Sequence, residues 1–189
     1  MDIAILAGGY GTRLKGLWEG PKCLVPYRGR PVIEHIVNIA LELKPRKIFL
    51  LLGYQASKVV AWREACCPHR DVVPVIETEP KGTAAAIRNA LLLMKAPLLV
   101  LNGDTVPQYN LWSEFTSVYD DGTRQTITAW AGGVYAGASL FGAYAMLEIE
   151  NSSANNLDTF IYNTDVRHIR VSGFLDVGTP EGFYKTQQS

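Results

Sequence analysis

A glycine-rich segment near the N-terminus has the residue types of a phosphate-binding loop, Leu6-Ala7-Gly8-Gly9-Tyr10-Gly11-Thr12-Arg13-Leu14. Glycine adopts backbone torsions that side chains forbid, and it lets main-chain N–H groups come close to an anion. Arg13 adds a planar, permanently charged guanidinium, and Lys22 adds a second cation nine residues later. We therefore expect this segment to hold a triphosphate, with a glycine-rich turn that binds nothing as the alternative.

Two better-known phosphate loops do not match this segment. A Walker loop requires the pattern G-x-x-x-x-G-K-[ST], which is absent from the sequence. The dinucleotide fingerprint G-x-G-x-x-G begins at Gly9-Tyr10-Gly11, but Leu14 stands where its third glycine belongs. Both of these classes of nucleotide site are therefore excluded.

Asp104 is a candidate metal ligand. It follows the apolar run at 97–101 and the pair Asn102-Gly103, so it can point a carboxylate into a cleft. Hard oxygen ligands suit Mg²⁺, which takes one or two carboxylates together with substrate phosphates. Taken alone, the sequence N-G-D is at least as common in a turn or a helix cap.

The elements that must position these groups alternate along the N-terminal half. Continuous apolar runs predict buried strands, and apolar residues at helical spacing predict helices between them. Such alternation indicates an α/β fold, a Rossmann-like three-layer α/β/α sandwich with a mostly parallel central sheet. Ligands of these sheets bind outside the carboxyl ends of the strands, which would bring the glycine-rich loop to Asp104. The predicted strands are 1–6, 47–52, 72–76 and 97–101, and the predicted helices start at Pro31 and cover 55–66 and 83–94.

The C-terminal half shows a weaker pattern. We expect a helix at 111–119, a strand at 125–130 and a segment from Gly132 that runs into a helix at 139–147. A polar loop follows, and the chain ends in a short helix. Two further short strands are predicted, at 159–162 and 168–171.

Composition bounds the class of protein. The 189 residues suit one domain, which we expect to cover residues 1–189. Eighteen basic and eighteen acidic residues balance, so no broad charge argues for nucleic acid or membrane as a partner. Three cysteines, with Cys66 and Cys67 adjacent, argue against a disulfide-stapled secreted domain. We expect a cytoplasmic protein without membrane segments, and a homo-oligomer stays open.

The glycine-rich segment and the following PKCLVPYRGRPVIEHIV resemble the opening of the sugar-1-phosphate nucleotidyltransferases. These enzymes join a nucleoside triphosphate to a sugar 1-phosphate and release pyrophosphate. The C-terminal FLDVGTPEGFY resembles the family's closing motif, in which an aspartate, here Asp176, shares a metal ion with the first aspartate, here Asp104. By itself, the closing segment could instead be a β-turn with Gly178 and Pro180.

The resemblance implies a role for further residues. It makes Arg13, Lys22 and Asp104 catalytic, with Mg²⁺ as cofactor and Mn²⁺ as its substitute. The segment EPKGTA resembles the family's E-x-x-G-T-A, whose glycine lies against the nucleoside, although leucine is usual where Lys81 stands. The implied nucleotide-binding residues are Leu6, Ala7, Gly8, Gly9, Gly11, Thr12, Arg13, Lys22, Glu79, Gly82, Thr83, Asn102 and Gly103.

The acceptor site is where the chain departs from the family. Gly133 and Tyr135 resemble a G-x-Y segment that lines the sugar pocket, and Glu148 resembles a glutamate that approaches the sugar. The family normally has a Glu-Lys pair before that segment, and its lysine meets the sugar phosphate. Here only residues 106–131 intervene, with Arg124 as their sole basic residue. Arg124 substitutes for the lysine, or the sugar phosphate is held differently, or the acceptor is unusual.

The activity that the resemblance implies is transfer of a nucleoside monophosphate to a sugar 1-phosphate (EC 2.7.7). By analogy with the mannose-1-phosphate and manno-heptose-1-phosphate guanylyltransferases, GTP with one of these two sugar phosphates is favoured. Two alternatives stay open. One is a catalytically idle subunit that senses nucleotides, and the other is nucleotidyl transfer to a non-sugar phosphate.

Overall fold

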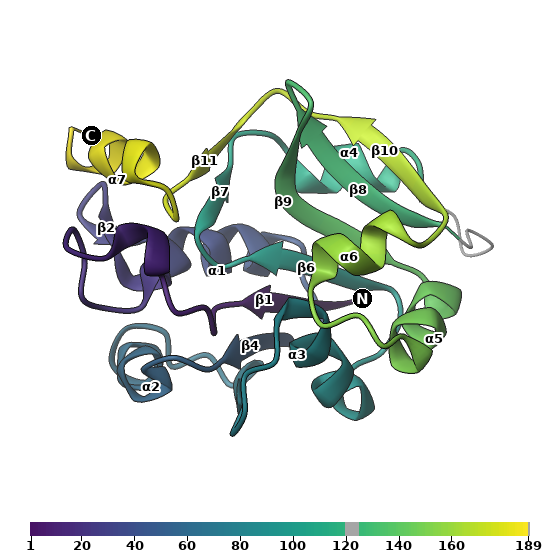
Figure 1. Cartoon of the computed structure of the whole chain (residues 1–189), viewed down its shortest axis with the longest axis horizontal. Coiled ribbons are helices and arrows are strands. Elements are labelled where there is room, and N and C mark those ends of the chain that lie inside the picture. Colours follow the sequence, from purple (N-terminus) through teal and green to yellow (C-terminus); the bar gives the residue numbers. More distant parts are fainter. Residues whose placement is uncertain (120–124, 189) are drawn as a thin grey trace.

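The computed structural model describes residues 1–119 and 125–188, which form a seven-stranded sheet with helices around it (Figure 1). The strands follow the spatial order β10-β8-β9-β6-β1-β4-β5. Neighbours pair in parallel except at β9, which runs antiparallel to both β6 and β8. These strands are β1 (Asp2–Leu6), β4 (Ile48–Leu52), β5 (Val72–Ile76), β6 (Leu98–Asn102), β8 (Thr126–Ala131), β9 (Val134–Phe141) and β10 (Val166–Arg170).

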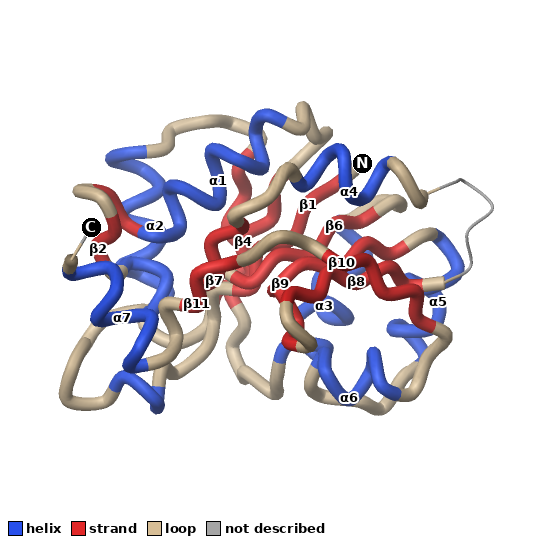
Figure 2. Tube along the Cα trace, turned by 90° about the horizontal axis from the view of Figure 1, so that it is seen from above, coloured by secondary structure: helices blue, strands red, loops and turns tan. Residues whose placement is uncertain are grey.

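Helices cover both faces of the sheet, which confirms the predicted three-layer α/β/α sandwich (Figure 2). One core lies between the sheet and α1 (Val32–Glu42), α2 (Ala56–Cys66), α4 (Leu111–Thr116) and α7 (Pro180–Gln187). The other core lies between the sheet and α3 (Thr83–Ala90), α5 (Ala143–Asn151) and α6 (Leu157–Tyr162). Short 3₁₀ helices span Thr12–Leu14, Lys22–Leu24 and Leu91–Leu93, and a small hairpin joins β2 (Pro26–Tyr27) to β3 (Arg30–Pro31).

The central strands explain why the sequence reads as continuous apolar runs. Side chains alternate between the two faces of a strand, so a strand covered on both faces needs apolar residues at every position. In β1, Ile3 and Ile5 enter the core that contains α1, whereas Ala4 enters the core that contains α3. In β4, Leu50 and Leu51 face opposite cores in the same way.

Two predicted elements of the C-terminal half are wrong. The predicted helix at 139–147 is the end of strand β9 followed by α5, because the segment up to Phe141 pairs with β6 on one side and β8 on the other. The predicted strand at 159–162 belongs to α6, whose Leu157, Phe160 and Ile161 recur at helical spacing and bury in one core. The predicted helix at 83–94 ends at Ala90 and continues as a 3₁₀ helix.

A second, two-stranded sheet was not predicted. Strands β7 (Thr105–Pro107) and β11 (Phe174–Asp176) pair antiparallel, with Asp176 opposite Thr105. Because β7 follows β6 directly, this pairing brings the C-terminal segment to the carboxyl end of the central sheet (Figure 1).

Within residues 1–119 and 125–188, none of the helices has both the length and the apolar character that crossing a membrane requires.

Candidate functional site

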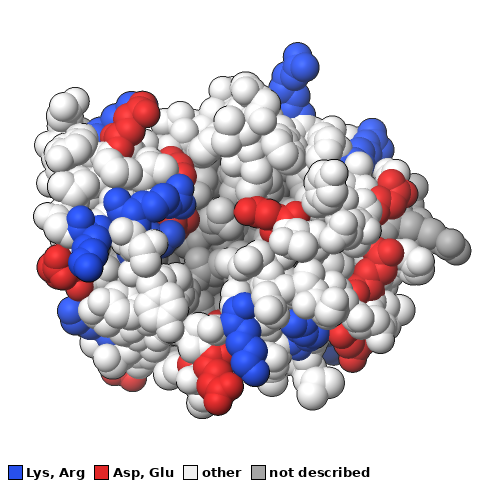
Figure 3. Space-filling view, viewed as in Figure 1, with Lys and Arg blue, Asp and Glu red and all other residues white. Residues whose placement is uncertain are grey.

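A cavity of about 390 Å³ lies at the carboxyl ends of the parallel strands. It is lined by the last residues of β1 and β6, Leu6 and Asn102, and by the loops that follow them. The space-filling view shows a hollow in this face of the molecule, with lysine and arginine atoms gathered on its left margin (Figure 3). Of the residues that the sequence nominated, the cavity is lined by Leu6, Ala7, Gly8, Gly9, Arg13, Lys22, Gly82, Thr83, Asn102, Gly103, Asp104, Tyr135 and Asp176.

Glycines directly after β1 and β6 allow close backbone packing against the neighbouring strands. A Cβ at Gly8 would lie 2.9 Å from the main-chain nitrogen of Gly53, at the end of β4. A Cβ at Gly103 would lie 2.8 Å from the carbonyl oxygen of Leu6, which already accepts the Gly103 N–H at 2.9 Å. Side chains at these positions would push apart the loops that frame the cavity.

Gly11 makes room for the side chain of Lys22. It does not line the cavity in the described structure, and it adopts a left-handed conformation with φ +68°. A Cβ at Gly11 would lie 2.9 Å from Cγ of Lys22, so glycine here leaves room for the stem of that lysine. Thr12 is exposed and likewise lies outside the cavity lining.

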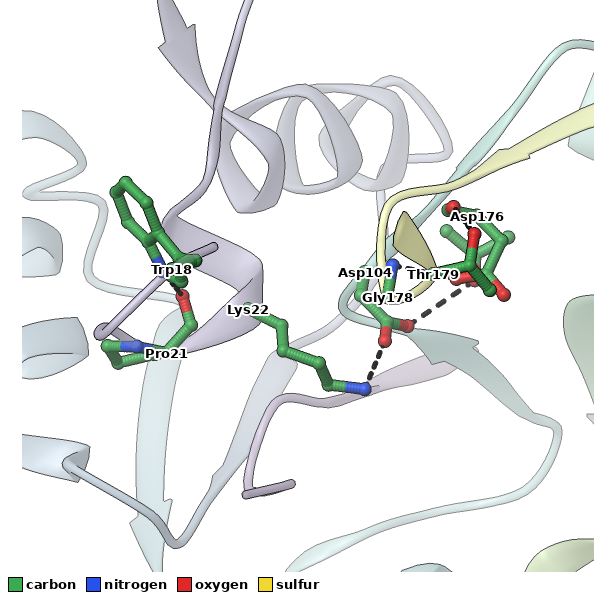
Figure 4. Close-up of polar contacts among 8 residues, drawn as sticks. Trp18, Pro21, Lys22, Asp104, Asp176, Gly178 and Thr179 are labelled. Carbon is green, nitrogen blue, oxygen red and sulfur yellow. Dashed lines mark hydrogen bonds and ion pairs between the residues drawn. The ribbon is translucent and has the colours of Figure 1, made fainter. Parts of the chain in front are cut away.

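Lys22 reaches into the cavity from a fixed turn. The indole Nε1–H of Trp18 donates to the carbonyl oxygen of Pro21 at 3.0 Å, immediately before the lysine (Figure 4). The ammonium group of Lys22 forms an ion pair with the Asp104 carboxylate, and these two side chains are only 21% and 13% exposed. The loop that carries Lys22 is therefore tied to the end of β6.

Asp104 and Asp176 lie next to each other. The Val177 N–H donates to the carbonyl oxygen of Asp104 at 2.8 Å, which continues the β7–β11 ladder past its last pair. A Cβ at Gly178 would overlap the Asp104 carboxylate, and it would lie 3.0 Å from Asp176 Oδ1 and 3.2 Å from Lys22 Nζ. The two carboxylates and the ammonium thus surround one point, which only glycine leaves free (Figure 4).

The rest of the closing motif supports Asp176. The Gly178 N–H donates to Asp176 Oδ1 at 2.8 Å, and the Thr179 hydroxyl donates to the Asp176 carbonyl oxygen at 3.0 Å. Thr179 also caps α7 by accepting the Gly182 N–H at 3.2 Å, and Pro180 begins that helix. The motif is therefore a turn and a helix start that together hold a carboxylate in the cavity.

The surroundings of Asp176 act on its ionisation in opposite directions. Burial raises the pKa of Asp176, and the charge of Asp104 raises it further, while the Gly178 N–H, Arg13 and Lys22 act in the opposite direction. Among the described residues no group of three or more His, Cys, Asp or Glu side chains could hold a metal ion. Two carboxylates do match the donor set that Mg²⁺ uses when substrate phosphates complete its coordination.

Besides Gly11 and Thr12, three nominated residues, Glu79, Gly133 and Glu148, lie outside the cavity lining. Glu79 points to solvent, with its side chain 79% exposed and paired with Lys81 at 3.5 Å. Gly133 belongs to the turn between β8 and β9, where φ of +82° requires a left-handed residue, and Glu148 lies on α5. None of these three lines the cavity in the described structure, and Arg124 falls outside the described residues.

Sequence reasoning missed two acids that do line the cavity, Glu77 and Asp158. Glu77 follows the last residue of β5, so the rule that ligands gather at the carboxyl ends of strands could have found it. Its Oε1 atom is buried and has no hydrogen-bond partner in the described part of the chain, although Asn89 bonds to the carboxyl group. Burial raises the pKa of Glu77, and the bond from Asn89 partly opposes this.

Comparisons with known proteins identify the family of the chain. Residues 3–163 match the family model of the MobA-like NTP transferase domain. The bifunctional protein GlmU of Methanococcus maripaludis is 36% identical over 107 residues, 56% of this chain and 25% of GlmU, so the chain spans about a quarter of that relative.

Solved structures share the fold. HddC from Yersinia pseudotuberculosis, complexed with GMP-PN, has a TM-score of 0.79 and 24% identity, with 99% of this chain and 98% of HddC covered. Rv0371c from Mycobacterium tuberculosis has a TM-score of 0.76 and 23% identity, with 100% of this chain and 98% of Rv0371c covered. The nucleotidyltransferase resemblance in the sequence is thereby confirmed, and the chain belongs to the family of MobA-like NTP transferase domains.

Proposed function

We propose that this chain transfers a nucleoside monophosphate from a nucleoside triphosphate to a sugar 1-phosphate, which yields a nucleotide-sugar and pyrophosphate. The observation that carries the proposal is the grouping of Asp104, Asp176 and Lys22 around Gly178, beside the glycine-rich loop. Membership of a nucleotidyltransferase family supports the reaction class.

The proposed chemistry is positioning and charge stabilisation. The attacking oxygen of a sugar phosphate is already an anion, so the reaction needs no strong base. The barrier lies in bringing that anion onto the α-phosphorus of another polyanion. Arg13 and Lys22 hold the triphosphate and stabilise the pyrophosphate that leaves, and main-chain N–H groups of the loop add donors without adding charge.

The carboxylate pair fits a divalent cation, because Gly178 leaves the point between the two groups free of side-chain atoms. Asp104 and Asp176 would hold Mg²⁺, or Mn²⁺ as its substitute. When bound there, such an ion neutralises and orients phosphates. The closeness of Asp104 to Asp176 also supports this assignment, because a cation between two carboxylates offsets the repulsion that raises the pKa of Asp176.

Glu77 supports guanine as the base. Leu51, Pro80 and Ala86 give the cavity apolar walls, and Glu77 lines the same cavity. Guanine presents N1–H and N2–H donors side by side, and a carboxylate accepts both at once. Uracil presents one N–H between two carbonyl oxygens, which a carboxylate repels. The fold match to HddC, solved with GMP-PN, agrees with this preference.

A substitution at Glu77 tests the base. A glutamine amide offers one acceptor and one donor, which pair with the N3–H and a carbonyl of uracil. Glu77→Gln should therefore lower the ratio of kcat/KM for GTP to that for UTP by about 10- to 100-fold, because a bond to a charged group contributes about 1.5–3 kcal/mol. Glu64→Gln, on an exposed position of α2, is the matched control. An effect of Glu79→Gln in place of Glu77→Gln would instead assign the base to the exposed carboxylate.

A substrate matrix tests the whole proposal. Pyrophosphate release is measured for GTP, UTP, CTP and ATP against several sugar 1-phosphates, with mannose 1-phosphate and manno-heptose 1-phosphate as the favoured acceptors. Mg²⁺-dependent release with at least one pair is expected. Nucleotide binding without turnover would support the nucleotide-sensing alternative, and turnover with phosphocholine alone would support a non-sugar acceptor.

A further inference from the structure

The wall of the cavity that faces away from the cations carries an acid. Asp158 lies in the first turn of α6 and Tyr135 lies in β9, and both line the cavity together with Asp104 and Asp176. In the space-filling view, acidic atoms at the right edge of the hollow stand across from the lysine and arginine atoms (Figure 3). Positive charge therefore gathers on one side of the cavity, and negative charge lies on the opposite side.

Asp158 has no neutralising partner in the described part of the chain. It is exposed, and no ion pair or hydrogen bond of its carboxylate is found among residues 1–119 and 125–188. Exposed acids such as Glu64 and Glu150 likewise form no ion pair with the described residues, so the feature that distinguishes Asp158 is its place in the cavity lining. The Asp158 carboxylate is thus available to a molecule in the cavity.

The neighbouring hydroxyl is held in place. Tyr135 Oη and Ser139 Oγ lie 2.8 Å apart in a hydrogen bond that either group can donate. Burial, and then the nearby Asp158 charge, raise the pKa of Tyr135, whereas the bond to Ser139 lowers it. Tyr135 therefore stays a neutral hydroxyl beside an acceptor-only carboxylate.

The positions of the charges determine how an acceptor can lie. Among the described residues that line the cavity, only Arg13 and Lys22 are basic. A phosphate must therefore lie toward Lys22 and the two aspartates, and the remainder of the acceptor extends toward Tyr135 and Asp158. A carboxylate at that end can only accept hydrogen bonds, and it repels a second anion.

We infer that Asp158 selects the acceptor by accepting hydrogen bonds from the hydroxyl groups of a neutral sugar 1-phosphate and by rejecting sugars that carry a carboxylate. The inference rests on the proposed function and adds a residue and a substrate class to it. It also replaces Glu148, which the sequence nominated for this role, with an acid that lines the cavity. Two neighbouring hydroxyls of one sugar match the two oxygens of the carboxylate.

The test compares two acceptors that differ at one carbon, mannose 1-phosphate and mannuronic acid 1-phosphate, with GTP as donor. Wild-type protein should prefer the neutral sugar by at least about tenfold in kcat/KM. Asp158→Asn should raise the KM for mannose 1-phosphate by about 10- to 100-fold, leave the KM for GTP unchanged, and reduce the discrimination against the acid. Glu150→Gln, an exposed position of α5, should change none of these values.

Three outcomes would overturn the inference. The first is an unchanged acceptor KM in Asp158→Asn, and the second is the expected rise in acceptor KM in Glu148→Gln instead. The third is a preference of the wild-type protein for phosphocholine over mannose 1-phosphate that the Asp158→Asn variant no longer shows. The last result would mean that the carboxylate selects a cation and not hydroxyl groups.

A binding measurement separates this inference from the proposed function. Calorimetry with the two sugar phosphates, in the presence of a non-hydrolysable GTP analogue, reads acceptor selection without turnover. Absence of turnover with selective binding of mannose 1-phosphate would contradict the proposed function alone. Equal binding of the two sugar phosphates, or binding of neither, would contradict the role of Asp158.

Discussion

The main-chain N–H of Val177 donates to the carbonyl oxygen of Asp104 at 2.8 Å. This bond joins two segments that are far apart in the sequence, and it places the carboxylates of Asp104 and Asp176 around the same point. The geometry of the site therefore depends on the β7–β11 pairing as much as on the acids themselves.

Gly178 should be intolerant of any side chain. Gly178→Ala puts a methyl group into the Asp104 carboxylate and within 3.2 Å of Lys22 Nζ, so the carboxylates and the ammonium must move apart. We expect pyrophosphate release to fall about 100-fold or more, because displacement of preorganised charge costs this much in other enzymes. Gly173→Ala is the control, since its Cβ would meet only the flexible Gln108 side chain, at 3.2 Å. Equal activities of the two variants would contradict the account.

Lys22 should matter most for the triphosphate. Lys22→Met keeps much of the stem that packs past Gly11 and removes the charge that pairs with Asp104. We expect the Kd for GTP, measured by calorimetry at fixed Mg²⁺, to rise about 10- to 100-fold, as for loss of a charged hydrogen bond. Lys58→Met, on the exposed surface of α2, serves as control and should bind GTP as wild-type protein does.

The ionised carboxylate of Glu77 should lower the free energy of unfolding of the nucleotide-free protein. Its pKa in the folded state is raised above the ordinary 4.5 by burial, so the native state binds the proton more tightly than the unfolded state does. Stability is then lost as pH rises from about that ordinary value through the raised pKa, and the loss is complete above it. Glu77→Gln should therefore raise the Tm near pH 7, and this gain should vanish as pH falls below 4.5.

Thermal unfolding across the pH range checks this prediction. The same variant should lose its preference for GTP, which would place Glu77 among residues that serve binding at the expense of stability. A Tm gain that persists unchanged at low pH would show that the burial of the charged carboxylate is not its cause.

The sequence predicted the strands that are covered on both faces, because such strands carry apolar residues at every position. Strands with apolar residues at every position, such as Ile48–Leu52, lie between two helical layers and were found with nearly the observed bounds. Residues 139–141 were misassigned to a helix because the alanines, glycine and serine of β9 give no strong period, and pairing with two neighbouring strands determines its conformation.

The sequence predicted the part of the site in which one motif contains both an acid, Asp176, and the residues that hold it in position. Asp176, Gly178 and Thr179 lie within four residues, so the sequence itself describes that turn. Glu79 lies outside the cavity lining and Glu77 belongs to it, and because the chain bends at Thr78 and Glu79, after the end of β5, no strand period relates the two acids. Asp158 was missed because only the packing of α6 brings it to the cavity.

The most direct test of the central claim is anomalous diffraction from crystals grown with Mn²⁺ and a non-hydrolysable GTP analogue. The account predicts an anomalous peak between the carboxylates of Asp104 and Asp176, in contact with the nucleotide phosphates, and its loss in Asp104→Asn and in Asp176→Asn but not in Asp165→Asn. A peak bound by other residues, or one that survives either of the first two substitutions at full occupancy, would contradict it.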